Sequence, residues 1–209
     1  EFPPHIAGGL GTACYGIVKG LANNGVETLF VMPSASGDED QTYTRILNAS
    51  DVEVSDVVKN PKEFLERVQF LRVGTNMVPY MDPVKFTEMS SKDQRSQIDD
   101  FKVNFKQKYK FSGKYGTNLM EEISRYAMVG EIASQHKDEF DVIHAHDWLT
   151  YMAGIAAKRI SGKPLVIHVH ATEFDRTGEN VNTQVFAIEQ MGMREADKVI
   201  TVSNLTRNI

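Results

Sequence analysis

The length and composition of the chain set the first limits on its fold and function. With 209 residues, of which 41% are apolar and 24% charged, it has the composition of a globular protein and can form one sizeable α/β domain. Its formal net charge of −5 argues against a nucleic-acid groove, because phosphate binding depends on clustered lysine and arginine. The single cysteine, Cys14, excludes an internal disulfide and favours a reducing, cytoplasmic location. No apolar run approaches the roughly 18 residues of a membrane-spanning helix.

The first third of the sequence predicts a helix, a strand and a loop. Residues 12–23 carry apolar side chains at helical spacing, and Gly25 follows as a stop signal. Residues 26–33, VETLFVMP, are a short apolar run that ends in proline, and they predict a buried strand. The polar stretch 34–44 predicts an exposed loop.

The middle of the chain is less regular. Short apolar runs at 52–54 and 67–73 predict two strands. Residues 74–115 include a lysine-rich segment and show no sustained period, so we expect an irregular insertion there. Residues 117–137 place apolar side chains on one face and charged ones on the other, and this pattern predicts a helix.

Strand and helix patterns alternate over the last third of the chain. We expect strands at 141–145, 165–169 and 198–202, helices at 148–160 and 181–196, and a further helix from Ser203. Near-continuous Val, Ile and Leu strands separated by helices are typical of a parallel sheet covered on both faces. The predicted fold class is therefore α/β, with a single doubly wound parallel sheet over residues 1–209.

A glycine-rich segment, AGGLGTACYG at residues 7–16, leads into the first predicted helix. Gly8, Gly9 and Gly11 let the backbone approach a ligand and direct free amides toward it. A helix N-terminus carries partial positive charge and unpaired N–H donors, so an anion such as a diphosphate suits this position. The spacing is not the G-x-G-x-x-G dinucleotide fingerprint. A tight turn that needs glycine only for packing is the alternative interpretation.

Two His-x-His pairs stand at the ends of two consecutive predicted strands. Residues two apart in a strand share a face, so His144 lies beside His146, and His168 beside His170. Ligands bind outside the carboxyl ends of parallel strands, and strands joined by one crossover are commonly neighbours. We therefore expect both pairs to converge on one crevice. The second member of each pair and Asp147 should lie nearest its mouth, with the first members buried.

The paired histidines raise the question of a metal site, because His-x-His is a frequent zinc-binding arrangement. However, HAHDW lacks the H-x-H-x-D-H order of the metallo-β-lactamases, and no cysteine or glutamate stands at an obvious completing position. We therefore expect no metal ion. A zinc-dependent hydrolase is one alternative, and histidines that are hydrogen-bonded for purely structural reasons are another.

Four segments together carry a family resemblance. In this order and at these spacings, EFPPHIAGGLG, DVIHAHDW, PLVIHVHATEF and ADKVITVS resemble the amino-terminal half of glycogen and starch synthases and related retaining glycosyltransferases of the GT-B fold, including sucrose and sucrose-phosphate synthases. The resemblance runs over nearly the whole chain and is thinnest over residues 34–115. It implies a Rossmann-like amino-terminal domain, with the carboxy-terminal donor domain absent from this sequence.

The resemblance implies that the glycine-rich segment contacts the sugar donor. Gly8, Gly9, Leu10 and Gly11 match the family's loop facing the diphosphate of a nucleotide sugar, of the ADP-glucose or UDP-glucose type. Synthases that use ADP-glucose usually have a lysine two residues before the double glycine, and Ile6 takes that place here. The segment is closer to the broader relatives of the synthases, which leaves the nucleotide and the acceptor open.

The resemblance also implies a site at the strand ends. His170 matches the family's active-site histidine, and we expect it to be catalytic together with Asp147. His146 and Trp148, from the H-D-W motif, should line the acceptor side of the cleft. The implied activity is transfer of a sugar, with retention and without a metal, from a nucleotide sugar to a glycan or small sugar. This sequence alone should be inactive. A non-catalytic carbohydrate-binding module is the alternative.

Overall fold

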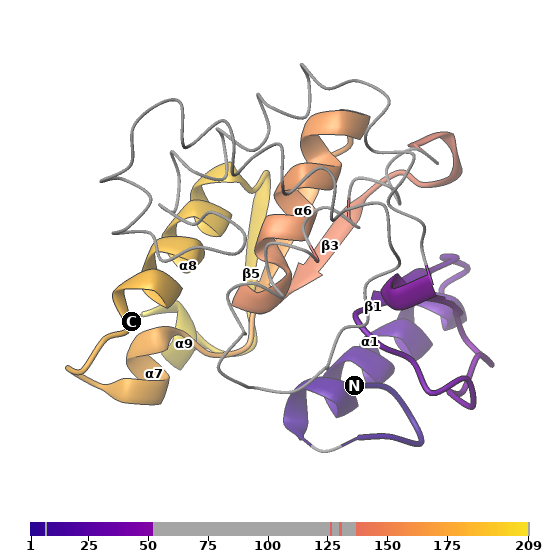
Figure 1. The fold of residues 1–209 in the computed structure, drawn as a ribbon, viewed down its shortest axis with the longest axis horizontal. Helices are drawn as coiled ribbons and strands as arrows, with labels where there is room; N and C mark the ends of the chain where they lie inside the picture. The colour runs from indigo at the N-terminus through magenta and orange to yellow at the C-terminus, as the bar shows by residue number, and fades with distance from the viewer. Residues whose placement is uncertain (7, 52–125, 127–129, 131–136, 209) are drawn as a thin grey trace, which may run out of the picture. The chain divides into compact units, whose positions relative to one another are not determined.

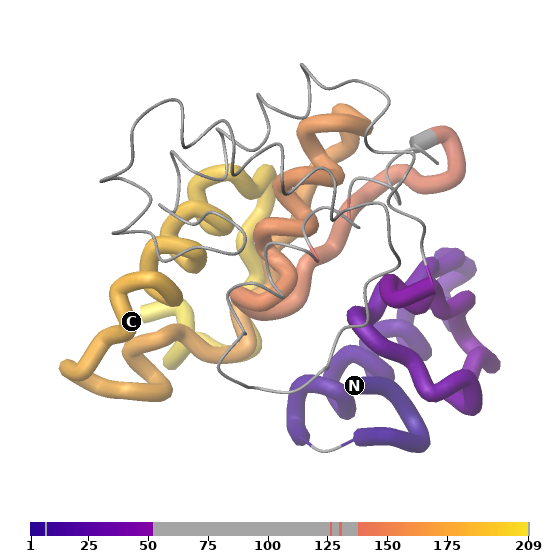
Figure 2. The backbone as a smooth tube through the Cα atoms, in the orientation of Figure 1, coloured from indigo at the N-terminus to yellow at the C-terminus, as the bar shows by residue number. Residues whose placement is uncertain are grey.

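A computed structural model of the protein describes residues 1–6, 8–51, 126, 130 and 137–208. Figure 1 labels most of the helices and strands, and Figure 2 draws the same residues as a coloured tube. The described residues fall into two compact units. Residues 1–51 belong to the first unit, and the described residues from 126 onward belong to the second.

Over residues 1–51, the first unit has one long helix and a pair of short strands. Its elements are α1 (Gly9–Asn23), β1 (Leu29–Met32), β2 (Arg45–Asn48) and a 3-10 helix, η1 (Ala49–Asp51). The two strands pair in parallel. Phe2, Val18 and Met32 are buried together at the centre of the unit, so the helix is held against β1 by a small apolar core.

Helix α1 begins at Gly9, whereas the apolar pattern predicts a start at Thr12. Gly8 precedes it in an extended conformation, and the Thr12 amide donates to the Gly8 carbonyl at 3.5 Å. The apolar pattern misses this first turn because glycine contributes no side chain to a helix face. The glycine-rich segment thus includes both the residues that precede the helix and the first turn of the helix itself.

The strand β2 is not predicted by the sequence pattern, because four residues are too few to show a clear alternation. It follows directly after the predicted loop at 34–44. The strands expected at 52–54 and 67–73 and the insertion expected at 74–115 lie outside the described residues. Of the helix expected at 117–137, Tyr126 and Gly130 are helical, and a 3-10 helix, η3 (Lys137–Glu139), stands at its end.

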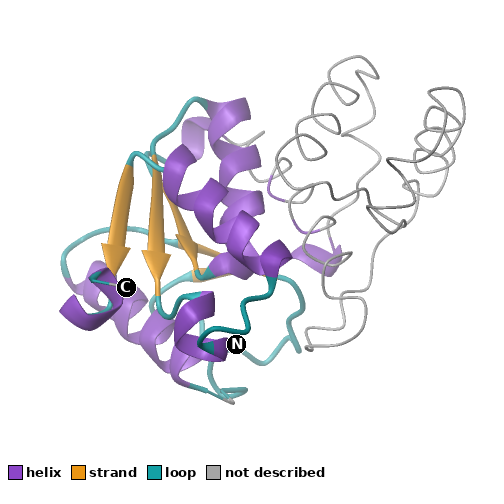
Figure 3. Cartoon of the chain, turned by 90° about the vertical axis from the view of Figure 1, so that its left-hand side faces the viewer, coloured by secondary structure: helices purple, strands orange, loops and turns teal. Residues whose placement is uncertain are grey.

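The second unit is built around a three-stranded parallel sheet. Its strands β3 (Ile143–His146), β4 (Leu165–Val169) and β5 (Lys198–Thr201) lie in the order β3-β4-β5, and their arrowheads point the same way in Figure 3. His146 is in register with His168 across the first ladder. The three predicted strands and the parallel α/β fold class are confirmed.

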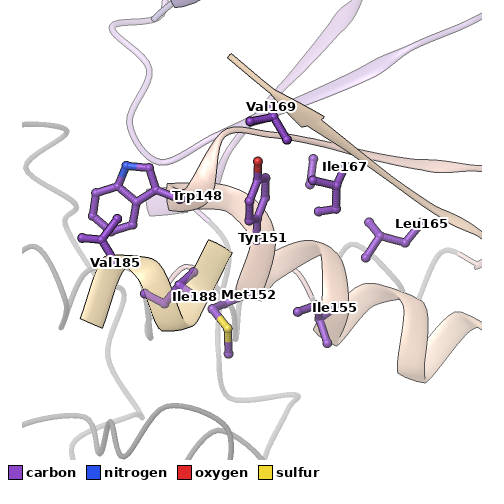
Figure 4. Close-up of a cluster of buried hydrophobic side chains, with 10 residues drawn as sticks. Trp148, Tyr151, Met152, Ile155, Leu165, Ile167, Val169, Val185 and Ile188 are labelled. Carbon is purple, nitrogen blue, oxygen red and sulfur yellow. The ribbon is translucent and has the colours of Figure 1, made fainter. Parts of the chain in front are cut away.

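Two helices, α6 (Trp148–Ser161) and α8 (Thr183–Glu195), pack against each other and against one face of this sheet. Their contact buries the main apolar cluster, drawn in Figure 4, whose members are Ala145, Trp148, Tyr151, Met152, Ile155, Leu165, Ile167, Val169, Val185 and Ile188. In β4, every second residue is buried in this cluster. The residues between them, Val166 and His168, therefore point to the opposite face.

Two short helices are the remaining elements of the second unit within its described residues. α9 (Asn204–Arg207) follows Ser203, as predicted. α7 (Glu173–Thr177) lies where the sequence predicts only a polar loop, because five residues show no helical period. Thr172 and Asp175 form a capping box at its start, in which each side chain accepts from the other's backbone amide. Within the described ranges, no helix is both long and apolar enough to cross a membrane.

Gly192 lets α8 approach Tyr151 of α6 closely. A Cβ atom added at Gly192 would lie 2.8 Å from Tyr151 Cγ, a separation that forces one helix to move. We expect Gly192→Ala to lower the free energy of unfolding by about 1–3 kcal/mol, the usual cost of overpacking a core. Urea unfolding of the full-length protein measures this change.

Gly20→Ala is the matched control, because a Cβ atom added at Gly20 in α1 meets nothing within 4 Å. Alanine is the better helix former, so this variant should gain up to about 1 kcal/mol. If Gly192→Ala were as stable as the unaltered protein, the two helices could separate at almost no cost in free energy, and their contact at Gly192 would not be a tight one.

Candidate functional site

Four histidines lie side by side on the sheet face opposite the core. His144 and His146 belong to β3, His168 belongs to β4, and His170 follows β4 directly after Val169. Because His146 is in register with His168, the centroids of neighbouring imidazole rings lie 4.1 to 5.4 Å apart. The structure therefore brings the two pairs together toward the carboxyl end of the sheet, as their spacing predicts. The expected difference in depth is wrong, because all four rings are half-buried and Asp147 is buried.

The two outer histidines share a hydrogen bond. His146 Nδ1 and His170 Nε2 are 3.1 Å apart. One of these nitrogens must carry the proton and the other must accept it, so the two tautomers are coupled. Each ring also has a second nitrogen, with which it can donate to or accept from a hydroxyl group. The pair is thus suited to a ligand rich in hydroxyl groups.

Burial holds the histidine cluster in its neutral form. The pKa of His144 is lowered to about 4, first by burial and then by His168 and His170. Burial, followed by charge repulsion from the other three histidines, lowers the pKa of His146 to about 3. The pKa values of His168 and His170 are also lowered, chiefly by burial. At neutral pH these four rings therefore offer hydrogen bonds without positive charge.

Two ring nitrogens of the cluster are buried and have no hydrogen-bond partner among the described residues. They are His144 Nε2 and His168 Nδ1. A buried polar atom left in this state costs about 1–3 kcal/mol, so such atoms are rare and call for an explanation. Both belong to the first member of a His-x-His pair.

Asp147, directly after β3, has an unusual backbone conformation. Its φ of 62° and ψ of 163° lie in a region that is otherwise almost confined to glycine and costs about 1–3 kcal/mol. The Asp147 amide donates to the His168 carbonyl at 3.0 Å, and its carbonyl accepts from the Thr150 amide at 3.0 Å. The strained turn is therefore fixed to β4 on one side and to α6 on the other.

The carboxylate of Asp147 is bound by Arg176 of α7. Arg176 Nη2 lies 3.0 Å from both carboxylate oxygens and donates to the Ala171 carbonyl at 2.8 Å. Burial raises the pKa of the Asp147 carboxyl, and the Arg176 guanidinium opposes this shift. Asp147 is only 7% exposed. The carboxylate of Asp147 is therefore already engaged by Arg176 within the described residues.

Two further carboxylates, those of Glu173 and Glu189, surround Arg176. No sequence motif singles out these two residues or Arg176. Glu189 Oε1 accepts from Arg176 Nη1 at 3.0 Å, and Glu189 Oε2 accepts from the Glu173 amide at 3.0 Å. A signal for this network was present in the sequence. Glu189 stands four residues after Val185 and three before Gly192, on the buried face of α8. A charge on such a face requires a partner.

Trp148, expected to line the acceptor side of a cleft, lies in the core. It is 5% exposed, and Figure 4 shows its indole beside Val185 of α8. The Arg176 guanidinium lies 6.0 Å from the ring centroid. Trp148 therefore supports the strand ends from beneath, through packing and a cation–π contact, rather than through an exposed surface of its own.

The glycine-rich segment belongs to the first unit. Gly8 and Gly9 are exposed, Leu10 is half-buried and Gly11 is buried. The Gly8 amide donates to Glu1 Oε2 at 3.0 Å, so the start of α1 already binds a carboxylate, as the helix dipole favours. None of the three glycines has a left-handed backbone, but a Cβ atom at Gly11 would lie 2.8 Å from Glu1 Cβ. Gly11 therefore allows Glu1 to pack closely against the first turn of α1.

Comparison with known protein families gives one match over almost the whole chain. The profile of the family described as "Starch synthase catalytic domain" matches residues 1–208. This match includes both the glycine-rich segment and the histidine cluster.

Individual relatives match over shorter stretches. An uncharacterized glycosyltransferase of Methanocaldococcus jannaschii is 39% identical over 69 residues, which are 32% of this chain and 18% of that protein. The glycogen synthase of Mycobacterium tuberculosis is 40% identical over 67 residues, which are 30% of this chain and 16% of that enzyme. The matched stretch thus spans less than a fifth of either relative.

Removing the guanidinium of Arg176 should destabilise the protein. Arg176→Met keeps most of the aliphatic chain but leaves the carboxylates of Asp147 and Glu189 without their counter-charge. We expect a loss of about 3 kcal/mol in the free energy of unfolding, the lower end for a broken buried ion pair, because Arg176 is 29% exposed. The loss should be larger at about pH 8 than at about pH 5.5, since protonated carboxyls need no counter-charge.

Arg159→Met is the matched control. Arg159 pairs with Glu195 at 3.4 Å, and both side chains are more than one third exposed. Such pairs contribute at most about 1 kcal/mol. Equal losses for the two variants in chemical unfolding would show that Arg176 acts as an ordinary surface charge and not as the centre of a buried network.

Proposed function

This chain belongs to the starch synthase catalytic-domain family, and we propose that it provides the amino-terminal half of a retaining glycosyltransferase. The reaction would move a sugar, glucose in the first instance, from a nucleotide-sugar donor to a glycan or small sugar acceptor. The observation that carries this proposal is the hydrogen-bonded pair His146 and His170 at the carboxyl ends of two parallel strands. That edge is where open α/β sheets bind their ligands.

His170 is the residue that we assign to the reacting sugar. Neutral imidazole can accept from one hydroxyl group and donate to another, and burial keeps the ring of His170 neutral. Its bond to His146 fixes its orientation. We assign His146 to the acceptor side of the same site. A ring held in this way can position a sugar hydroxyl close to the anomeric carbon, without attracting a competing anion.

The start of α1 is the part of the chain that we assign to the donor. Gly8 and Gly9 are exposed there, and Leu10 and Gly11 continue the same helical turn. Unpaired amides at a helix N-terminus stabilise a diphosphate that gains charge as it leaves, in the manner of an oxyanion hole. No metal ion is needed for this step.

The proposed reaction makes one bond and breaks one bond at the same carbon. The bond from the anomeric carbon to the diphosphate oxygen breaks, and the acceptor oxygen bonds to the same face of the sugar. The acceptor proton leaves with the diphosphate. Residues 1–209 would supply the acceptor side and the glycine-rich turn, and a second α/β domain would supply the remaining donor contacts. Closure of two such domains excludes water from the reaction.

Asp147 and Trp148 act as positioning residues in this proposal. Asp147 shares its strained turn with His146, its neighbour in the chain, and Arg176 clamps the carboxylate. Trp148 packs in the core at the start of α6. Together they hold the end of β3 in the place where His146 meets His170. Their contribution to turnover would therefore pass through the orientation of the histidines.

The full-length protein should transfer sugar from one member of a panel of nucleotide sugars, and thermal shift with each member identifies which one binds. The product should keep the anomeric configuration of the donor, which proton NMR of the glycan determines. EDTA should leave the rate unchanged. Binding of glycans without transfer from any donor would favour a carbohydrate-binding module, and loss of activity with EDTA that zinc restores would favour a metal-dependent hydrolase.

His170→Ala should lower the turnover number of the full-length enzyme by roughly a hundredfold or more, the scale for loss of one positioned hydrogen-bonding group. His168→Ala is the matched control, because it removes the same ring one pleat earlier on the same strand. It should mainly lower the melting temperature, since its half-buried ring packs against the neighbouring imidazoles. Equal effects of both variants on turnover and on melting temperature would contradict the assignment of His170.

Gly9→Val should raise the KM for the nucleotide sugar by roughly tenfold or more while leaving the protein folded. The backbone at Gly9 is not left-handed, and an added Cβ atom meets nothing within 4 Å. The valine side chain would instead occupy the space that the diphosphate needs. Gly16→Val, on the same helix and also with nothing within 4 Å, should leave KM unchanged. A normal KM for Gly9→Val would remove this turn from the donor site.

A further inference from the structure

Three of the four clustered histidines form a group with the dimensions of a metal site. One ring nitrogen from each of His144, His146 and His168 can be chosen so that all three lie within 4.8 Å of one another. Two of these residues stand two apart on β3, and the third is in register with His146 on β4. The three side chains therefore project from the same face of two paired strands. The strands hold them in place without any movement of a loop.

The spacing is close to what zinc requires. Three imidazole nitrogens at 2.0–2.1 Å from a tetrahedral ion are about 3.4 Å apart. The separation of up to 4.8 Å between these nitrogens exceeds that value by at most about 1.4 Å, which side-chain rotations can correct. Three protein nitrogens leave the fourth position of the ion for water, and imidazole is a preferred ligand of zinc, copper and nickel.

A bound cation would account for the unpartnered nitrogens. His144 Nε2 and His168 Nδ1 are buried without a hydrogen-bond partner among the described residues. Both residues are in the group of three, and neither has a role in the proposed transfer. A buried neutral imidazole nitrogen can donate its lone pair to a metal ion, so the ion takes the place of a missing hydrogen-bond donor.

We infer that His144, His146 and His168 bind a divalent transition-metal cation of the zinc class. Binding is separate from the transfer chemistry. It also has a consequence that rests on the proposed function. His146 is shared between this group and the hydrogen bond from its Nδ1 to His170, so an ion that takes His146 Nδ1 as its ligand replaces that hydrogen bond. The cation would then inhibit sugar transfer.

The test is a titration of the chelator-treated full-length protein with Zn²⁺, and with Co²⁺ as a spectroscopic probe. One equivalent should bind, and bound Co²⁺ should show the intense visible bands of a low-coordinate site. His144→Leu should weaken binding by roughly a hundredfold or more, because even changes outside the ligand set cost about 10–100-fold. His168→Leu provides a second variant, in which leucine fills the space of the ring. His5→Gln should bind normally, since His5 pairs with Asp38 at an exposed position.

Each outcome decides one part of the inference. Absence of stoichiometric binding, or binding that survives in both leucine variants while circular dichroism shows that they are folded, overturns the metal site. Stoichiometric binding by a protein that transfers no sugar leaves the site standing and rejects the proposed function. Binding to an active enzyme whose turnover is unchanged by Zn²⁺ overturns the inhibition alone. Inhibition that EDTA reverses and His144→Leu prevents supports both parts.

Discussion

The parallel register between β3 and β4 is the constraint on which the candidate site depends. It places Ala145 and Ile167 on the face that α6 and α8 cover, and His146 and His168 on the other. A slip of one residue in either strand would turn its histidines into the apolar core and expose aliphatic side chains. The packing of the core therefore also fixes the geometry of the four imidazoles, and the site needs no separate scaffold.

A buried network of charges secures the ends of the two strands. Arg176 joins the turn after β3, through Asp147, to the segment after β4, through Ala171, and Glu189 ties the same guanidinium to α8. The hydrogen bonds hold Asp147 in a backbone conformation that a free chain would avoid. Strain in one turn is thus offset by contacts from two other segments, which is the arrangement expected where side chains must be held in place for binding.

Sequence patterns predicted the parts of the molecule in which one face is uniformly apolar. β4 and α6 show this most clearly, since their buried positions recur at periods of two and of three to four. β2 and α7 are too short to show a period. The convergence of the histidines followed from strand spacing, but the orientation of Asp147 depends on Arg176, which is 29 residues away in sequence. No local pattern encodes such a contact.

The neutral histidine face affects how a charged molecule would reach the protein. Four uncharged rings exert no long-range attraction on an anion, and the chain as a whole carries a formal charge of −5. The net charge of residues 1–209 by itself therefore repels an anionic ligand, and short-range contacts such as backbone amides favour its binding to this part of the protein. Dissolved salt screens that field over a distance of about 10 Å at 0.1 M. Association of an anion with residues 1–209 by themselves should accordingly become faster as ionic strength rises, the reverse of electrostatic steering.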